Sequence, residues 1–284
     1  MCFASIIVFL IFILIPDNVY AWGPAAHLEF GMDILNHTSL LPPLLQRLLL
    51  TFPYDYLYGN ISADIVVGKN MTEALKHCHN WSIGLKALKS AETNSQKAFA
   101  YGYISHLAAD TIAHNYYIPE KFIQSFSSRV LKHTYWEIRF DALADKSVWK
   151  LPSRISKGVH QENDSLLKNI LEDTPLSFRT NKTIFSSILL IHRLKQWHNM
   201  LSVLSSSSRW VLSIEERSEY YDRSITAIKD FLTHGTKAKC FRDDPIGRER
   251  LETAKRLRSH LKTLKRNGKE WETAMEKALH IIKS

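Results

Sequence analysis

Residues 96–116 form a long, mostly apolar stretch whose pattern predicts one uninterrupted helix, buried on several faces. The whole chain has only ten Gly and nine Pro in 284 residues, so positions that break helices are few. No part of the sequence shows sustained strand alternation with hairpin turns. The sequence therefore predicts an all-α fold.

Helical spacing of apolar residues predicts further helices on both sides of this stretch. Pro43 and Pro119 are each expected in the first turn of a helix, where proline is tolerated. A loop is expected at residues 149–158. The further predicted helices span residues 26–35, 43–53, 71–88, 119–144, 164–172, 183–203, 214–233 and 246–282.

The N-terminus has the pattern of an export signal. Residues 4–16 are almost all apolar, but they are too few to cross a bilayer, which takes about 20 helical residues. Small residues at Val19 and Ala21 fit a signal-peptidase site, and cleavage would leave Trp22 first. Because no Lys or Arg precedes the apolar run, an uncleaved membrane anchor is the alternative. We expect a signal peptide at 1–21, one domain at 22–284, and a secreted or periplasmic monomer.

Composition excludes several classes of protein. With 45% hydrophobic and 23% charged residues, the chain is neither collagen-like, nor low-complexity disordered, nor a polytopic membrane protein.

Once Cys2 is removed with the signal, Cys78 and Cys240 could form a disulfide or remain two free thiols. Six N-x-S/T sequons, which carry glycans only if the host glycosylates, start at Asn36, Asn60, Asn70, Asn80, Asn163 and Asn181.

The chain has 13 His, and their spacing is its most specific signal. His106, Asp110 and His114 follow one another at intervals of four, which places them along one stripe of a helix. His133 and Glu137 repeat this interval in the next predicted helix. Two such pairs on facing helices can bind metal ions, and a metal would compensate charge buried among apolar neighbours. Hydrogen-bonded core histidines are the alternative, and the two tandem pairs favour the metal.

Other candidate ligands lie nearer the N-terminus. His27 follows shortly after Trp22, whose α-amine could coordinate zinc once it is free and deprotonated. Asp64 could equally be a helix cap, and the His-x-His pair of His77 and His79 is a weak metal signal alone. These residues indicate a metal site only in combination with the His and carboxylate pairs on the two helices.

In this order, the residues resemble the zinc-dependent phospholipase C family. The shared pattern is Trp-Gly followed by a His, then an Asp, then His-Asn-Trp, then H-x-x-x-D-x-x-x-H and H-x-x-x-E. The family is similar in fold to fungal single-strand nucleases and to the catalytic domain of glycosylphosphatidylinositol-specific phospholipase D. The resemblance covers residues 22–141. The C-terminal half carries no recognised motif.

The resemblance implies three zinc ions in an all-helical single domain. One zinc would take His79, His106 and Asp110. A second would take the amine and carbonyl of Trp22, together with His27 and the bridging Asp110. The third would take His114, His133 and Glu137. Asp64 matches the family's acidic residue near the water, a candidate general base. The gap between Asp110 and His114 is shorter than in the phospholipase C enzymes, and His77 competes with His79.

A ligand set of His, Asp and Glu without Cys suits a hydrolytic zinc site better than a structural one. Together with this chemistry, the resemblance implies hydrolysis of phospholipids at a membrane surface by metal-activated water, with phospholipase C regiochemistry. The alternatives are glycosylphosphatidylinositol phospholipase D activity, and a single-strand nuclease or nucleotidase with the same metals. A metal-dependent binding protein without activity is a third class. No nucleic-acid partner is expected under the main hypothesis.

Residues 248–283 are rich in Lys and Arg interspersed with Glu. They could contact anionic lipid headgroups or nucleic acid, or form an ordinary solvated helix face. Both interpretations stay open. His192 and His198 are six apart, so a helix would point them in different directions, and we expect both to be structural.

Overall fold

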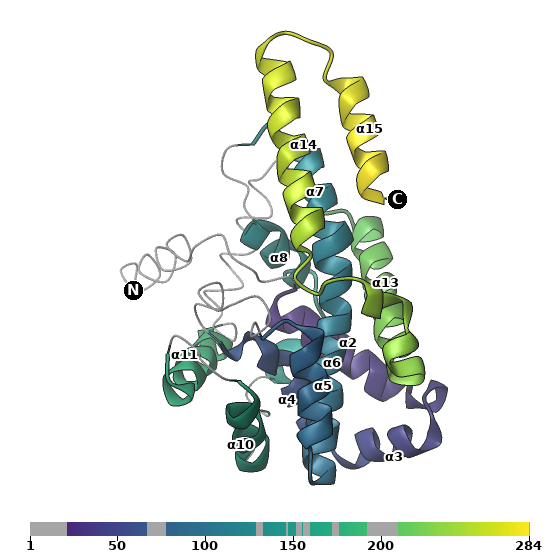
Figure 1. The fold of residues 1–284 in the computed structure, drawn as a ribbon, viewed down its shortest axis with the longest axis vertical. Coiled ribbons are helices and arrows are strands. Elements are labelled where there is room, and N and C mark those ends of the chain that lie inside the picture. Colours follow the sequence, from purple (N-terminus) through teal and green to yellow (C-terminus); the bar gives the residue numbers. More distant parts are fainter. Residues whose placement is uncertain are drawn as a thin grey trace.

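The structure is a computed structural model that describes residues 22–66, 78–128, 133–145, 147–151, 155, 160–171, 176–191 and 210–283. Over these residues it consists of helices and their connections, and the predicted all-α fold is confirmed (Figure 1). The main helices are α2 (Pro24–Asn36), α3 (Pro43–Thr51), α4 (Pro53–Ser62), α5 (Trp81–Ser90), α6 (Asn94–Ile112), α7 (Ile118–Gln124), α8 (His133–Asp141), α10 (Gln161–Ile170), α11 (Phe178–Ile191), α13 (Ile214–His234), α14 (Arg248–Arg266) and α15 (Glu272–Lys283). The short ones are η1 (Thr38–Leu40), η2 (Ala63–Ile65), η5 (Ala113–Tyr117), η6 (Val148–Lys150), η7 (Gly235–Lys237) and η8 (Lys239–Arg242).

Helix α6 is the central element, and α4, α5 and α13 pack around it (Figure 1). It begins with a capping box, in which Thr93 and Gln96 satisfy each other's backbone N–H groups. Gly59 of α4 and Gly102 of α6 lie where the two backbones meet, because a Cβ on either would overlap a carbonyl oxygen of the other helix. This close approach brings the C-terminal end of α4, with η2, beside the middle of α6.

The predicted helix 96–116 is present, but its last turns differ. Residues Ala113–Tyr117 form a π-helical turn between α6 and α7. A π-turn inserts extra residues per turn, so His114 no longer continues the stripe of His106 and Asp110. Such turns are common at functional sites, and His114 within this one contacts Pro245 and His133.

Other boundaries also differ from the predictions. The predicted helix 119–144 is two helices, α7 and α8, and the predicted helix 246–282 is the hairpin of α14 and α15. Gly268, with a φ of 65°, lies in the turn of that hairpin. Helix α4 was missed because Pro53 looked like an end, whereas it occupies the first turn of a new helix. The expected loop at 149–158 contains the end of η6, and residues 71–77 and 192–203 of two predicted helices lie outside the described residues.

Several other expectations fall on particular side chains. Cys78 and Cys240 are both buried and are not joined in a disulfide: the Cys78 sulfur lies 3.3 Å from His79 Nδ1, and the Cys240 thiol lies 3.5 Å from the carbonyl oxygen of Ala227. The sequon asparagines Asn60, Asn163 and Asn181 are buried, and their amides donate hydrogen bonds to Tyr56, Asp55 and Leu176. Among the described helices, none has both the length and the apolar character needed to cross a membrane. The predicted signal peptide at 1–21 lies outside the described residues.

Candidate metal centre

The N-terminal end of α2 is fixed beside the last turn of α6. Trp22 is fully buried, and its indole Nε1 donates a hydrogen bond of 2.9 Å to the carbonyl oxygen of Ala109. The same indole packs against Phe140 and Tyr117, with ring centroids 4.1 and 4.9 Å apart. Because Ala109 directly precedes Asp110, this anchor places the start of α2 beside that carboxylate.

His27, His106 and Asp110 come together one turn into α2. The Nε2 atom of His27 lies 3.3 Å from one Asp110 oxygen, and the Nε2 atom of His106 lies 3.2 Å from the other. The two imidazole rings stack, with centroids 3.7 Å apart and planes 12° apart. All three side chains are at most 1% exposed. The predicted pair at an interval of four on α6 therefore meets the N-terminal His, as expected for a shared site.

His79 and Asp64 complete the same cluster. The His79 Nε2 atom lies 3.3 Å from Asp110 Oδ2, 3.2 Å from Asp64 Oδ1 and 3.0 Å from His106 Nε2. Asp64 reaches the cluster from η2 at the end of α4, and His79 from the turn before α5. The competing candidate, His77, lies outside the described residues.

These spacings fit a shared zinc ion. Two ligand atoms about 2.0–2.1 Å from a tetrahedral zinc lie about 3.3 Å from each other. The donor atoms of this cluster are separated by 3.0 to 3.3 Å. Neither oxygen of Asp110 and neither ring nitrogen of His27 has a well-aligned hydrogen bond, although all are buried. Buried polar atoms of this kind need a partner, and a cation among them would supply one.

A hydrogen bond to the backbone fixes the orientation of the His106 ring. Its Nδ1 lies 2.8 Å from the carbonyl oxygen of Asn60, and a carbonyl can only accept, so Nδ1 carries the proton. The Nε2 lone pair then points toward Asp110 and His79. This arrangement, in which the second ring nitrogen donates to a carbonyl, is typical of histidine ligands.

Electrostatics favours the ligand state of Asp110 and His27, whereas burial of His106 is outweighed by the charge of Asp110, which raises the pKa of that imidazole, so His106 would release a proton when a metal binds. Burial opposes ionisation of Asp110, but the charges of the neighbouring His106 and His27 outweigh it, so the pKa of Asp110 lies well below the usual range. Burial, reinforced by the neighbouring His106, lowers the pKa of His27. A carboxylate beside a neutral imidazole can donate electron pairs to a cation.

The remaining predicted ligands form a second group around the π-turn. The Nε2 atom of His133 lies 3.3 Å from Glu137 Oε1, as the interval of four on α8 predicts. The rings of His114 and His133 are perpendicular, with centroids 5.1 Å apart. His114 Nδ1 lies 2.5 Å from the carbonyl oxygen of Pro245, so Nδ1 carries the proton and Nε2 is the atom that could bind a metal. Among the described residues, ligand atoms lie within 4.8 Å of one another in two groups, His27–His106–Asp110 and Asp64–His79–His106. The ligand atoms of His114, His133 and Glu137 are farther apart.

Asp141 is a supporting residue that the sequence did not reveal. Its two carboxylate oxygens accept the backbone N–H groups of Ala25 and Ala26 at 3.2 and 3.0 Å, which satisfies the N-terminal end of α2. A Cβ on Gly23 would overlap the same carboxylate, which explains the glycine after Trp22. The only signal was that Asp141 extends the spacing of His133 and Glu137 by four more residues.

We expect Gly23 and Asp141 to be energetically coupled. Asp141→Ala should cost about 1–2 kcal/mol of unfolding free energy, because it removes a helix N-cap acceptor. Gly23→Ala should cost about 1–3 kcal/mol through overlap with the carboxylate. The double variant should cost at least about 1 kcal/mol less than the sum, because the shorter side chain makes room. Urea unfolding would measure this, and Gly23→Ala with Asp33→Ala, at the other end of α2, is the additive control.

Asp141 should also give the stability a pH dependence. Burial raises the pKa of Asp141 from 3.8 to about 7, against the two backbone hydrogen bonds that favour ionisation. The folded chain therefore holds this proton more tightly than the unfolded chain, and the contribution is lost as pH rises from about 4 to about 7. Relative to Asp141→Asn, the metal-free wild type should lose unfolding free energy over that range and change little above it. A difference that grows with pH would contradict this, as measured by urea unfolding with a chelator.

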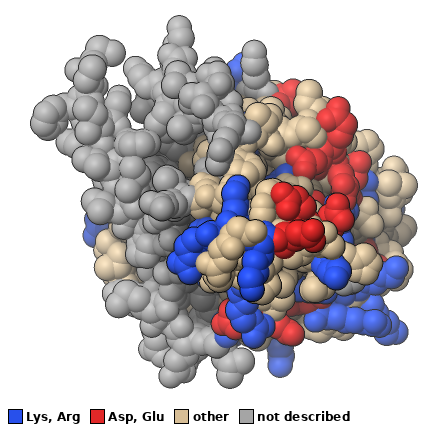
Figure 2. Space-filling model, turned by 90° about the horizontal axis from the view of Figure 1, so that it is seen from above, with Lys and Arg blue, Asp and Glu red and all other residues tan. Residues whose placement is uncertain are grey.

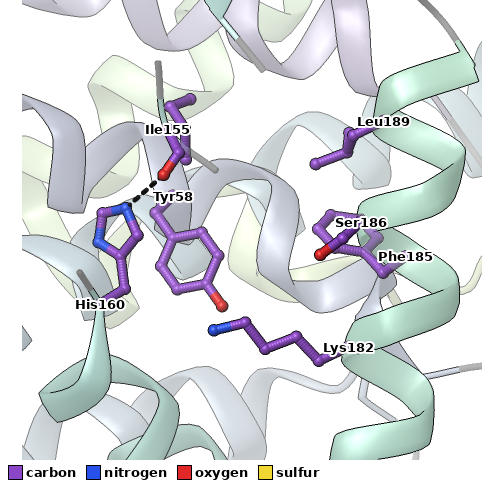
Figure 3. Close-up of a pocket in the computed structure, with 7 residues that line it drawn as sticks. All are labelled: Tyr58, Ile155, His160, Lys182, Phe185, Ser186 and Leu189. Atoms are coloured by element: carbon purple, nitrogen blue, oxygen red, sulfur yellow. Dashed lines mark hydrogen bonds between the residues drawn. The ribbon is translucent and has the colours of Figure 1, made fainter. Parts of the chain in front are cut away.

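A separate pocket of about 340 Å³, part of it open to solvent, lies between α4, α10 and α11. Figure 3 shows Tyr58 and His160 on one side and Phe185 and Leu189 of α11 on the other, with Lys182 extending from α11 toward Tyr58. Tyr58 donates a 2.6 Å hydrogen bond to Asp164, which also pairs with Lys182. None of the predicted metal ligands lines this pocket. Its polar groups join α10 and α11 to α4, whose C-terminal end leads to Asp64.

Comparison with known proteins agrees with this geometry. A protein-family model described as zinc-dependent phospholipase C matches residues 26–193. No curated protein and no solved structure matches the sequence. The matched region contains every predicted ligand except Trp22, and it covers more than half of the chain. The chain therefore belongs to the zinc-dependent phospholipase C family and is a hydrolase of that type.

Proposed function

We propose that this enzyme is exported, binds three zinc ions, and cleaves the glycerol-side phosphodiester bond of phospholipids. The observation that carries the proposal is Asp110, whose two oxygens lie 3.2 to 3.3 Å from three imidazoles drawn from three separate segments. A carboxylate so surrounded, in a fully buried cluster without thiolate ligands, supports a bridging role between two zinc ions.

The ligand assignment follows the predicted sets. His79, His106 and Asp110 would hold one zinc. His27, Asp110 and the amine and carbonyl of Trp22 would hold a second, and the burial of Trp22 over Ala109 supports this. His114, His133 and Glu137 would hold the third, supported by the 3.3 Å approach of His133 and Glu137.

When bound, zinc supplies the positive charge that offsets the phosphodiester and lowers the pKa of coordinated water. The chain contributes orientation and proton transfer. Asn60 and Pro245 fix the rings of His106 and His114 through their carbonyl oxygens. Asp64, 8% exposed and 3.2 Å from His79, would accept the proton of the attacking water, and its burial beside the ligands favours that role.

The proposal is tested by zinc content and by a substrate panel. The mature chain should hold about three zinc ions and should hydrolyse phosphatidylcholine to diacylglycerol and a phosphorylated headgroup. Release of phosphatidic acid instead would indicate phospholipase D regiochemistry. Preferential cleavage of glycosylphosphatidylinositol or of single-stranded DNA would replace the proposed substrate, and zinc without hydrolysis of any of them would indicate a binding protein.

Asp64→Asn should lower hydrolysis by about 10²–10⁴-fold, the usual contribution of a general base, while zinc stays bound. Rates across pH and zinc content should be measured on the same samples, because loss of the base flattens the acidic limb of the pH profile. Asp222→Asn, an exposed substitution of the same kind on α13, is the control. Unchanged hydrolysis with full zinc would remove Asp64 from the mechanism.

A further inference from the structure

Helix α14 concentrates the positive charge of the chain. It carries eight Lys or Arg and two Glu, a net charge of +6, whereas the whole sequence has a net charge of +9. Helix α15 and the turn before it have no net charge, because they contain three Lys and three Glu. The charge is therefore a property of one helix and not of the C-terminal hairpin as a whole.

Six of the eight cations of α14 form an inner and an outer set; of the other two, Arg256 donates a hydrogen bond to Thr253 and Lys265 lies over the ring of Trp271. The inner set is fastened to the body. Arg258 donates a 3.0 Å hydrogen bond to the carbonyl of Ser128 and lies over the ring of Phe122, and Arg250 lies over Tyr116. Leu251, Ala254 and Leu261 form the buried face of the helix. These contacts hold α14 against α7 and fix which side faces outward.

The outer set forms one line along the helix, which we call the basic stripe: Arg248, Lys255, Lys262 and Arg266. Intervals of seven, seven and four residues return to nearly the same side of an α-helix. All four residues are exposed. At 1.5 Å per residue the stripe is about 27 Å long. A straight row of fixed cations matches a flat anionic surface better than a compact anion.

The stripe begins at the metal centre. The carbonyl of Pro245 accepts the His114 hydrogen bond, and Gly247, with a φ of 63°, packs against His114 immediately before α14 starts. From there α14 runs to the upper end of the molecule beside α15 (Figure 1). Figure 2 looks onto that end and shows several Lys and Arg side chains at the surface, with the largest group of Asp and Glu side chains toward the upper right.

We propose that the basic stripe binds the anionic headgroups of a phospholipid surface. Clustered Lys and Arg are attracted to anionic bilayers, and each contributes about a five-fold gain in partitioning. The choice of lipid over other polyanions rests on the proposed phospholipase function, because a surface contact that begins beside the metal ligands would keep the enzyme on its substrate. The contact itself does not require hydrolysis.

The test is vesicle sedimentation of the full mature chain. Vesicles of phosphatidylcholine alone and with about 30% phosphatidylglycerol give the two surfaces. Wild type should bind the anionic vesicles more tightly, and high salt should weaken this binding. The variant Lys255→Glu/Lys262→Glu/Arg266→Glu should lose at least about 100-fold in partitioning, because it removes three cations and adds three negative charges. The matched control, Lys89→Glu/Lys97→Glu/Lys168→Glu, makes the same change in net charge at exposed positions of α5, α6 and α10 and should bind like wild type.

Each other outcome overturns the proposal. Equal binding of wild type to both surfaces, or equal loss in both triple variants, would mean that the stripe has no specific role. Stripe-dependent binding of single-stranded DNA without vesicle binding would point to a different polyanion. Circular dichroism checks the fold of each variant. Hydrolysis of a soluble chromogenic phosphodiester should persist in the stripe variant, so a failure of binding and a failure of the proposed chemistry are distinguishable.

Discussion

Asp110→Asn is expected to remove two of three zinc ions and to lower phospholipid hydrolysis by on the order of 10³-fold or more. The substitution keeps the size of the side chain but replaces one ligand oxygen with an amide nitrogen and removes the negative charge. Both original oxygens lie 3.2 to 3.3 Å from imidazole nitrogens, so each is placed to share an ion with a histidine. Zinc content by mass spectrometry and the rate of phosphatidylcholine hydrolysis are the measurements.

Glu137→Gln is the matched comparison. It makes the same chemical change in the set of His114, His133 and Glu137, and should remove one zinc ion while the Asp110 cluster keeps two. Asp222→Asn, exposed on α13, should keep all three. If Asp110→Asn retains full zinc, the bridging assignment is wrong. If both ligand variants lose all zinc together, the ions bind as one cooperative unit.

The helical parts of the site were predictable because spacing alone determines them. His106 and Asp110, and likewise His133 and Glu137, lie four residues apart, and the helix brings each pair within 3.3 Å. Long-range convergence was not derivable in the same way. That His27, His79 and Asp64 meet Asp110 was expected from resemblance to a family, because no local pattern says which segments pack together.

The features that were missed depend on tertiary packing. The π-turn at Ala113–Tyr117 redirects His114, and the carbonyl of Pro245, distant in sequence, holds that ring. No helical periodicity contains this information. The role of Asp141 also depends on tertiary packing, because it can cap α2 only when α8 lies against the start of α2. The separation of α14 from α15 had a local signal in Gly268, which the apolar periodicity on either side concealed.

A chain that keeps one extra residue before Trp22 should bind one zinc fewer and hydrolyse phospholipid about 100-fold more slowly. The physical reason is that an α-amine with pKa near 8 can become a metal ligand, whereas a peptide nitrogen cannot donate its electron pair. Trp22 is already fixed by its indole hydrogen bond to Ala109, and Gly23 by its packing against Asp141. The new amine would therefore appear next to Asp110 without a change in the fold.

The extended chain should recover both zinc and activity when a protease removes the extra residue from the folded protein, because the rest of the site is preformed. Zinc content and hydrolysis are measured before and after this cleavage. An acetylated mature N-terminus, which has the correct length but no basic amine, should behave like the extended chain. Full activity in the extended or acetylated chain would show that the amine is not a ligand. In that case the second zinc would depend on His27 and Asp110 alone, and export would have no role in activating the enzyme.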